Sequence, residues 1–292
     1  MLRFLLPALA SIFLFATAAC THSGRAGSTG IPWKGTAVPL SLETGIPSVQ
    51  AMINHQPASL IVDSGASLSA VTESLANRLG LRKTGVVRIT GFSGGASVYP
   101  TARLPSVLLG SARFDHVPVA ILPDEIFGHA SGSIEGILGL PLFAETRLTL
   151  DYPRRQLRLS SPGTRQPKGL PVAMRLDEGI PRIILTLNNR PVETIVDTGY
   201  GGGLAIDPSK FGIGSTPTGV NEVGSEMSGI SVAPIHRLDG LILLNGTPFL
   251  SRPPVAIIPR NEPVLGSAVL QNFTVSFDQK RGLLILGQEE GI

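Results

Sequence analysis

The sequence predicts an all-β protein made of two related lobes, with only short helices. The first observation is a repeated phrase, because residues 60–65 (Leu-Ile-Val-Asp-Ser-Gly) return 134 residues later at 194–199 (Thr-Ile-Val-Asp-Thr-Gly). The second is composition: 34 glycines and 24 prolines make about a fifth of the 292 residues, which is typical of many short strands joined by turns. The third is that each half repeats the same order of strand-like runs and turn signals around its copy of the phrase.

The repeat extends well beyond the phrase. Residues 46–65 and 180–199 align without a gap and share eight identities over 20 positions. A later landmark also recurs, with residues 136–139 (Gly-Ile-Leu-Gly) matching residues 263–266 (Pro-Val-Leu-Gly). The distance from the aspartate of the phrase to the last landmark glycine is 76 residues in the first half and 69 in the second. A loss of this size is typical of a shortened surface loop, so we expect two homologous lobes, residues 36–162 and 163–292.

Local signals place the phrase within the lobes. Residues 48–53 and 182–187 are predicted strands, each followed by an Asn-X-X-Pro turn into a buried strand that ends at the phrase. In the first half a helix is predicted from an N-terminal cap at Thr72 to a stop at Gly80, and in the second half only a shorter segment near Pro208. Both halves are predicted to close with a hairpin, at residues 152–154 and 279–282.

The N-terminus has the features of a signal peptide, residues 1–19. Arg3 supplies a positive charge, and an apolar run of about 13 residues follows, which is too short to span a bilayer as a helix. Cys20 is the only cysteine, and its position after small residues resembles a bacterial lipobox, in which the cysteine becomes a lipidated N-terminus. Ordinary cleavage after Ala19, leaving a free thiol, is the alternative. Residues 20–35 are then the lipidated N-terminus and a flexible tether.

Each copy of the phrase presents one carboxylate, Asp63 or Asp197, followed by a hydroxyl residue and a glycine. Two carboxylates presented identically by two related halves are what an enzyme needs to activate a water molecule between them. The five histidines have no metal-ligand spacing, and the net charge of +3 comes without any run of five like charges. We therefore expect no metal, no cofactor and no nucleic-acid partner.

These residues resemble the retropepsin-like and pepsin-like aspartic proteases, and most of all the bacterial retropepsin-like aspartyl proteases, here as two fused copies. The likeness covers roughly residues 40–287. It depends on the Asp-Ser-Gly-Ala-Ser motif at 63–67, its continuation over 71–81, the glycine-rich segment 89–99 and the landmark at 136–139. The resemblance implies two acid-protease β-barrel lobes related by a pseudo-two-fold axis, with Asp63 and Asp197 as the catalytic dyad.

The same resemblance assigns supporting roles. Ser64 and Thr198 would join the two loops through bonds from their hydroxyl groups to backbone, and Gly65 and Gly199 would allow the tight approach. Gly94 and Gly95 would form the apex of a flap that closes over an extended peptide. Asp151 and Asp278, which also match between the halves, are expected to cap their own hairpin turns.

One position departs from the family pattern, because Tyr200 follows the second Asp-Thr-Gly where the first half has Ala66. A bulky ring there is expected either to line the cleft or to displace the loop. The departure leaves two alternatives open: only Asp63 is competent and two chains pair through their first halves, or the chain is a non-catalytic peptide-binding or scaffolding protein. A serine hydrolase using Ser64 or Ser67 is disfavoured, because neither lies in a Gly-X-Ser-X-Gly elbow.

The leading hypothesis is an aspartic-type endopeptidase that is a monomer with an internal pseudo-dimer. Its substrate would be a peptide or protein in the bacterial cell envelope. A lipid on Cys20 would anchor it on the periplasmic side. Because Thr21 replaces the aspartate that retains lipoproteins at the inner membrane, the outer membrane is the preferred location.

Overall fold

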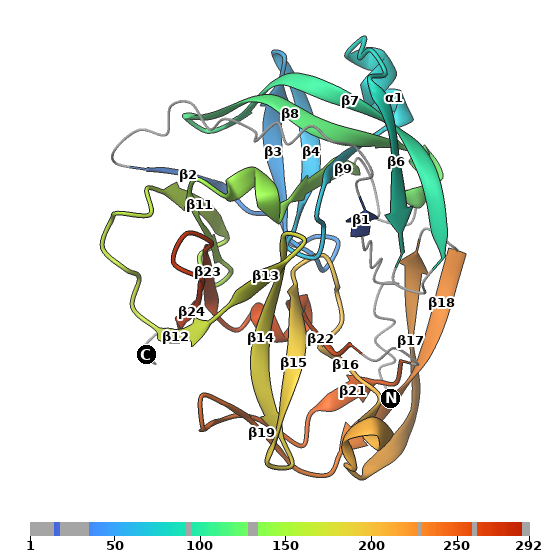
Figure 1. Cartoon of the computed structure of the whole chain (residues 1–292), viewed down its shortest axis with the longest axis vertical. Helices are drawn as coiled ribbons and strands as arrows, with labels where there is room; N and C mark the ends of the chain where they lie inside the picture. The colour runs from blue at the N-terminus through green and yellow to red at the C-terminus, as the bar shows by residue number, and fades with distance from the viewer. Residues whose placement is uncertain are drawn as a thin grey trace.

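The computed structural model describes residues 15–17, 35–91, 95–127, 134–226, 229–258 and 262–287. It confirms the all-β prediction: strands dominate, and the described residues include two short α-helices, α1 (Glu73–Arg78) and α2 (Ser267–Leu270). Figure 1 shows two β-rich bodies joined along one side by a shared sheet. We call residues 36–162 the first lobe and residues 163–287 the second lobe. Within the described ranges, no helix combines the length and apolar character needed to cross a membrane.

A closed barrel of six strands forms the first lobe. Its strands pair in the order β7-β3-β4-β9-β5-β8, and β7 pairs with β8 to close the ring. A further strand, β6, extends β7 outward as a hairpin, and the opposite edge of β6 pairs with β1. The bounds are β1 (Phe15–Thr17), β3 (Ser48–Ile53), β4 (Gln56–Asp63), β5 (Ser69–Thr72), β6 (Gly85–Thr90), β7 (Ala96–Leu109), β8 (Ala112–Leu122) and β9 (Ile134–Gly139).

Strand pairing in the second lobe matches that of the first. The hairpin β14–β15 corresponds to β3–β4, and β15 pairs in parallel with β22 as β4 does with β9. β16 lies between β22 and β21 as β5 lies between β9 and β8, while β18 with β19 takes the place of β7. The bounds are β13 (Arg175–Asp177), β14 (Ile180–Leu187), β15 (Arg190–Asp197), β16 (Leu204–Ala205), β17 (Ser215–Glu226), β18 (Gly229–Leu238), β19 (Leu241–Leu244), β20 (Thr247–Ser251), β21 (Pro254–Ala256) and β22 (Val264–Gly266).

The predicted Asn-X-X-Pro turns are two-residue hairpin turns. Asn54 and His55 have φ angles of 46° and 65°, and Asn188 and Asn189 have φ angles of 48° and 60°. Positive φ at both central residues is the geometry whose twist matches that of antiparallel strands, and asparagine tolerates it better than most residues. The turns therefore set the register in which each motif strand, β4 or β15, pairs with the strand before it.

Helix α1 follows its sequence signals. The Thr72 hydroxyl accepts the backbone N–H of Leu75 at 3.0 Å, and Gly80 ends the segment with φ of 62°. The second lobe has only a 3-10 turn, η3 (Pro208–Phe211), at the corresponding place. Short 3-10 turns also occur at η1 (Asp124–Ile126) and η2 (Leu140–Phe143).

A six-stranded sheet joins the two lobes. Its order is β12-β24-β23-β10-β11-β2, so each lobe supplies three strands, and β10 and β23 meet antiparallel at the centre. Thr149 lies opposite Ser276 at this centre, and their buried hydroxyl groups are 2.8 Å apart. The sheet therefore fixes the relative position of the lobes. The bounds are β2 (Thr36–Pro39), β10 (Arg147–Asp151), β11 (Gln156–Ser160), β12 (Leu170–Ala173), β23 (Thr274–Asp278) and β24 (Leu283–Gly287).

Asp151 and Asp278 cap their turns as predicted. Their Oδ1 atoms accept the backbone N–H of Arg154 and Arg281, at 3.2 Å in each case. Sequence reasoning missed the partner of Asp278, Arg147, whose side chain is 1% exposed and whose Nε lies 3.3 Å from Asp278 Oδ2. Arg147 also donates to the carbonyl groups of residues 162, 164 and 165 at 2.9–3.2 Å, so one buried guanidinium joins both lobes and the chain where it passes from one lobe to the other.

Replacing Arg147 by methionine is expected to destabilise the protein by about 3–5 kcal/mol, because it removes the buried partner of Asp278, leaving that carboxylate only the half-exposed Arg281 at 3.7 Å, and it takes the donor from three carbonyl groups. Arg158→Met is the matched control, because Arg158 is 45% exposed and pairs with the buried Asp151 at 2.9 Å, so its loss should cost about 1 kcal/mol or less. Urea unfolding of both variants measures the difference. Equal midpoints for the two variants would contradict the role assigned to Arg147.

Candidate active site

Each motif aspartate ends a buried strand beside a landmark glycine. In the parallel pairs β4–β9 and β15–β22, Asp63 lies opposite Gly139 and Asp197 lies opposite Gly266. A Cβ atom added to Gly139 would lie 2.7 Å from the Ala66 carbonyl oxygen, so the landmark glycine supports the motif loop by direct backbone contact. The landmark position therefore needs glycine, because the motif loop that follows Asp63 folds back over it.

The two motif loops are joined by reciprocal hydrogen bonds. The Ser64 hydroxyl donates to the Val196 carbonyl at 2.7 Å and accepts the Thr198 N–H at 3.0 Å. The Thr198 hydroxyl in turn donates to the Val62 carbonyl at 2.7 Å and accepts the Ser64 N–H at 2.9 Å. All four bonds are buried, and each hydroxyl satisfies one backbone donor and one backbone acceptor of the other lobe.

This connection brings the two carboxyl groups face to face. A Cβ atom built on Gly65 would lie 2.2 Å from Asp197 Oδ2, and one built on Gly199 would lie 2.4 Å from Asp63 Cγ. Any side chain at either glycine would occupy the space of the opposite carboxyl group. Gly65 and Gly199 are therefore required by close approach, and the pair Asp63–Asp197 forms within one chain.

Backbone donors hold one oxygen of each carboxyl group. Asp63 Oδ1 accepts the Gly65 N–H at 2.7 Å, and Asp197 Oδ1 accepts the Gly199 N–H at 2.7 Å and the Tyr200 N–H at 3.1 Å. Among the described residues, the Oδ2 atoms receive no hydrogen bond from any group outside the pair. These two oxygens are the atoms left for a shared proton and a reacting water.

The environment raises the pKa of both aspartates. Both side chains are almost fully buried, at 1% and 0% exposure, and burial is the largest cause of each increase. For Asp63, the negative charge of Asp197 raises the pKa further, while hydrogen bonds from the backbone lower it in part. Two like charges in hydrogen-bonding contact cannot both persist in a low-dielectric site, so the pair keeps one proton to higher pH than an ordinary carboxyl group would.

Tyr200 does not displace the loop, so that sequence-based expectation for it is wrong. Its ring packs on Gly266, where an added Cβ atom would lie 2.4 Å from Tyr200 Cδ1, and it is 4% exposed. Its hydroxyl faces the carboxyl group of Glu222 on β17, and burial raises the pKa of Glu222 while their hydrogen bond lowers it in part. With the ring in this position, the Gly199 and Tyr200 N–H groups still donate to Asp197 Oδ1.

Further residues beneath the dyad escaped the sequence analysis. The Ser267 hydroxyl donates to the Thr198 carbonyl at 2.7 Å, and the buried Tyr152 of the first lobe reaches Ser267. In the opposite direction, Gln279 of the second lobe donates its amide N–H to the Leu140 carbonyl at 2.8 Å. Tyr152 and Gln279 each follow a matched hairpin aspartate, and this shared position is the signal that could have identified them.

Two predicted sites fall partly or wholly outside the described residues. Gly94 and Cys20 are not described, whereas Gly95 accepts the Gly91 N–H at 2.8 Å near the end of the β6–β7 hairpin. A second hairpin, β17–β18, extends from the second lobe, and Figure 1 shows both hairpins on the side of the molecule opposite the shared sheet. Within the part of the chain that the structure describes, no cluster of three histidine, cysteine, aspartate or glutamate side chains could hold a metal ion.

A comparison with known families gives a match within the first lobe. A family model described as aspartyl protease matches residues 49–142, about a third of the chain. The matched segment includes Asp63, helix α1, the β6–β7 hairpin and the landmark at 136–139. No curated protein sequence matches the chain. The match supports a general aspartic protease function. It does not include the second lobe, whose likeness to the first is seen in the strand pairing and loop geometry described above.

Thr198→Val is expected to lower the free energy of unfolding by about 2–5 kcal/mol, because it leaves the Val62 carbonyl and the Ser64 N–H buried without partners. Thr198→Ser keeps the hydroxyl and should cost less than half as much. Thr216→Val, at an exposed position, serves as the control and should change stability by about 0.5 kcal/mol or less. Chemical denaturation compares the three, and a valine variant as stable as the serine variant would contradict the role of the hydroxyl.

Proposed function

We propose that this protein is an aspartic-type endopeptidase that hydrolyses peptide bonds by means of a water molecule activated between Asp63 and Asp197. The observation that carries the proposal is the reciprocal fit of each carboxyl group against the glycine of the opposite loop. That fit requires two matched loops, and it gives two buried carboxyl groups with raised pKa values in one chain. We further propose that the lobes are two fused copies of one aspartic protease unit, as the matched strand pairing suggests.

The chemistry follows from one proton shared by the pair. The ionised carboxylate removes a proton from water while the water oxygen bonds to the scissile carbonyl carbon. The protonated partner gives its proton to the carbonyl oxygen, which stabilises the developing charge. The C–N bond then breaks as the leaving nitrogen takes a proton from the dyad, and a hydroxyl proton of the intermediate returns to the other carboxylate. The dyad ends the cycle with one proton and no covalent intermediate.

Peptide binding as an added strand is supported by the edge of β6. The chain's own residues 15–17 already pair antiparallel with this edge, with Phe15 opposite Thr90 and Thr17 opposite Arg88. An extended substrate could pair with the same backbone donors and acceptors of β6. Pairing of this kind depends on the backbone and not on the identity of the substrate side chains. Removal of residues 1–19 as a signal peptide would leave this edge open.

A non-catalytic peptide-binding protein is the second candidate, and the same β6 edge would serve it. The feature that favoured this alternative, Tyr200, packs on Gly266, and the Asp197 loop keeps the same Oδ1 contact to its glycine as the Asp63 loop. The endopeptidase is therefore the proposal we prefer. Pairing of two chains through their first lobes is not needed to assemble a dyad.

Asp63→Asn and Asp197→Asn are each expected to reduce peptide cleavage by at least about 1,000-fold while leaving the protein folded. Both variants should also be more stable than the parent at neutral pH. The folded pKa values are raised, so the pair contributes most stability below the ordinary aspartate pKa of about 4 and loses it as pH rises through the raised values. Thermal unfolding from pH 4 to pH 8 should show the advantage of the variants growing with pH.

Cleavage of a mixed peptide library across the same pH range tests the activity directly. The parent rate should fall toward alkaline pH as the shared proton is lost. Loss of activity in only Asp63→Asn would assign the second lobe to a partner role. A well-folded parent that cuts no peptide at any pH would overturn the endopeptidase and favour the peptide-binding candidate.

We also propose that lipid on Cys20 anchors the protein on the periplasmic side of the cell envelope, in the outer membrane by preference. Metabolic labelling with a radioactive fatty acid should label the parent, and Cys20→Ala should lose both the label and the membrane fraction. A parent protein released in soluble form without lipid would instead support ordinary cleavage after Ala19.

A further inference from the structure

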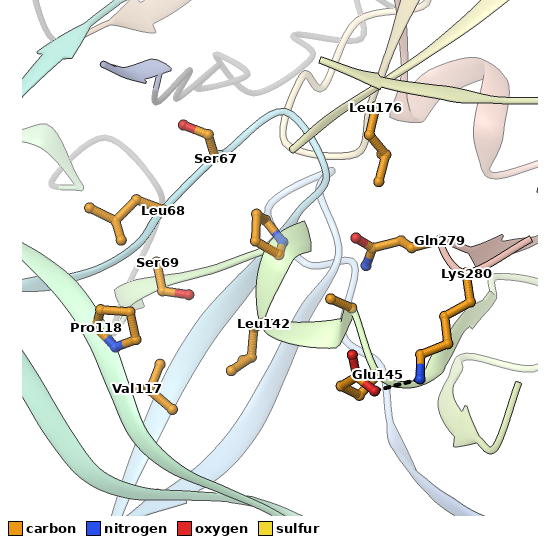
Figure 2. A pocket seen from close by; sticks show the side chains of 12 residues that line it. Ser67, Leu68, Ser69, Val117, Pro118, Leu142, Glu145, Leu176, Gln279 and Lys280 are labelled. Carbon is orange, nitrogen blue, oxygen red and sulfur yellow. Dashed lines mark ion pairs between the residues drawn. The ribbon is translucent and has the colours of Figure 1, made fainter. Parts of the chain in front are cut away.

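A cavity of about 660 Å³ lies between the lobes, next to the Asp63 loop. Figure 2 shows Ser67, Leu68 and Ser69 along one side of it and residues of the second lobe along the other. The second lobe contributes Leu176 from β13 and Gln279 and Lys280 from the β23–β24 turn. The cavity contains neither dyad aspartate, so it is separate from the site described above.

The surroundings of the cavity are mainly apolar and are held by contacts between the lobes. Leucine side chains of both lobes and proline side chains of the first lobe line it, and the Lys280 ammonium pairs with the Glu145 carboxylate at 2.5 Å at its edge. Behind it, the turn at Gly179 packs so closely on Pro141 that an added Cβ atom would lie 2.7 Å from Pro141 Cγ. The cavity is therefore a formed pocket whose size is within the range of small-ligand sites.

The two lobes differ at one position in the wall of this pocket. Ala144 follows the landmark Gly139 by five residues, and Gln271 follows Gly266 by the same five. Ala144 lines the pocket, whereas the Gln271 side chain extends to the Gly45 carbonyl and donates to it at 2.7 Å. Gly45 and Gly179 are also equivalent, because each lies 18 residues before its motif aspartate. The Gln271 side chain occupies the space toward Gly45, and the smaller Ala144 side chain leaves the equivalent space toward Gly179 open.

The position of the pocket fits an extended peptide. Ser67 is four residues beyond Asp63, so their Cα atoms are at most about 15 Å apart. An extended substrate advances about 3.3 Å per residue, so the pocket is within reach of a side chain no more than about five positions from the scissile bond. Because its surroundings are apolar, the pocket would bind an aliphatic or aromatic side chain.

We propose that this pocket, opened by Ala144, is an exosite that binds an apolar side chain of the peptide substrate outside the dyad. This inference rests on the proposed endopeptidase function. It assigns the chain a preference for substrates that carry an apolar residue at one outer position, no more than about five residues to one side of the bond cut. Burying one such side chain supplies about tenfold or more in affinity, which should appear in KM.

The test uses a peptide that the parent cleaves and its relatives with serine at each outer position. The parent should prefer the apolar residue at one outer position by about tenfold in kcat/KM, through KM. Ala144→Gln, which introduces the residue that the second lobe has at the equivalent position, should reduce the preference to less than about twofold. Leu176→Lys, on the opposite side of the pocket, should do the same. Gln271→Ala is the matched control and should keep the full preference.

Binding separates this inference from the proposed function. Fluorescence polarisation of labelled peptides is measured on Asp63→Asn and on Asp63→Asn with Ala144→Gln. Cleavage by the parent with no difference between Ala144→Gln and Gln271→Ala would overturn the exosite and leave the endopeptidase intact. If the parent cuts nothing, tighter binding of the apolar peptides that is lost with Ala144→Gln still supports the pocket. Peptide binding that is equal in both proteins, or absent, would overturn it.

Discussion

Two carboxyl groups are buried face to face at the boundary between the lobes, and the rest of the structure serves to hold them there. Such a pair is costly, because burial and like charge both oppose ionisation. It persists only because each loop is held to the other by hydroxyl groups that satisfy buried backbone atoms of the opposite lobe. Ser64 and Thr198 thus offset the repulsion of the aspartates that precede them.

The wider fold extends this connection outward. The parallel pairing of each motif strand with its landmark strand places Gly139 and Gly266 directly beside the aspartates. Beneath them the shared sheet joins the lobes through β10 and β23, and Arg147 adds a buried ion pair across the same boundary. Because these contacts involve both lobes at several levels, the separation of the two carboxyl groups is set by the whole protein and not by one loop.

Much of this arrangement could be predicted from the sequence. The alternation of apolar residues, the Asn-X-X-Pro turns and the Thr72 cap depend on short-range chemistry, and they gave the strands, the hairpins and helix α1 in the correct places. The facing aspartates could be predicted because the same short motif occurs in both halves with the same flanking strands and landmark. Two such copies are expected to form the same loop. The capping roles of Asp151 and Asp278 followed from local turn chemistry in the same way.

What the sequence did not reveal depends on contacts between distant residues. Nothing near Arg147 indicates that it will meet Asp278, which lies 131 residues away, since the register of β10 with β23 decides the contact. Glu222 lies in a segment with ordinary strand composition, and only the fold brings it to Tyr200. The sequence did not show that the Tyr200 ring leaves its loop in place, because this depends on the space above Gly266, which local pattern does not describe.

The differences between the lobes are as informative as their likeness. At the dyad the halves agree atom for atom in the bonds from Ser64 and Thr198, because any departure would leave buried groups unpaired. Farther from the dyad the two lobes differ at equivalent positions. Where the first lobe has Ala66, Arg147 and Ala144, the second lobe has Tyr200, Thr274 and Gln271. A symmetric pair of lobes must still bind an asymmetric chain, whose two directions differ. Divergence at positions beside the cleft, with the dyad held constant, is how one fold can meet both requirements, and Ala144 with Gln271 is the difference that changes the shape of the surface a substrate would meet.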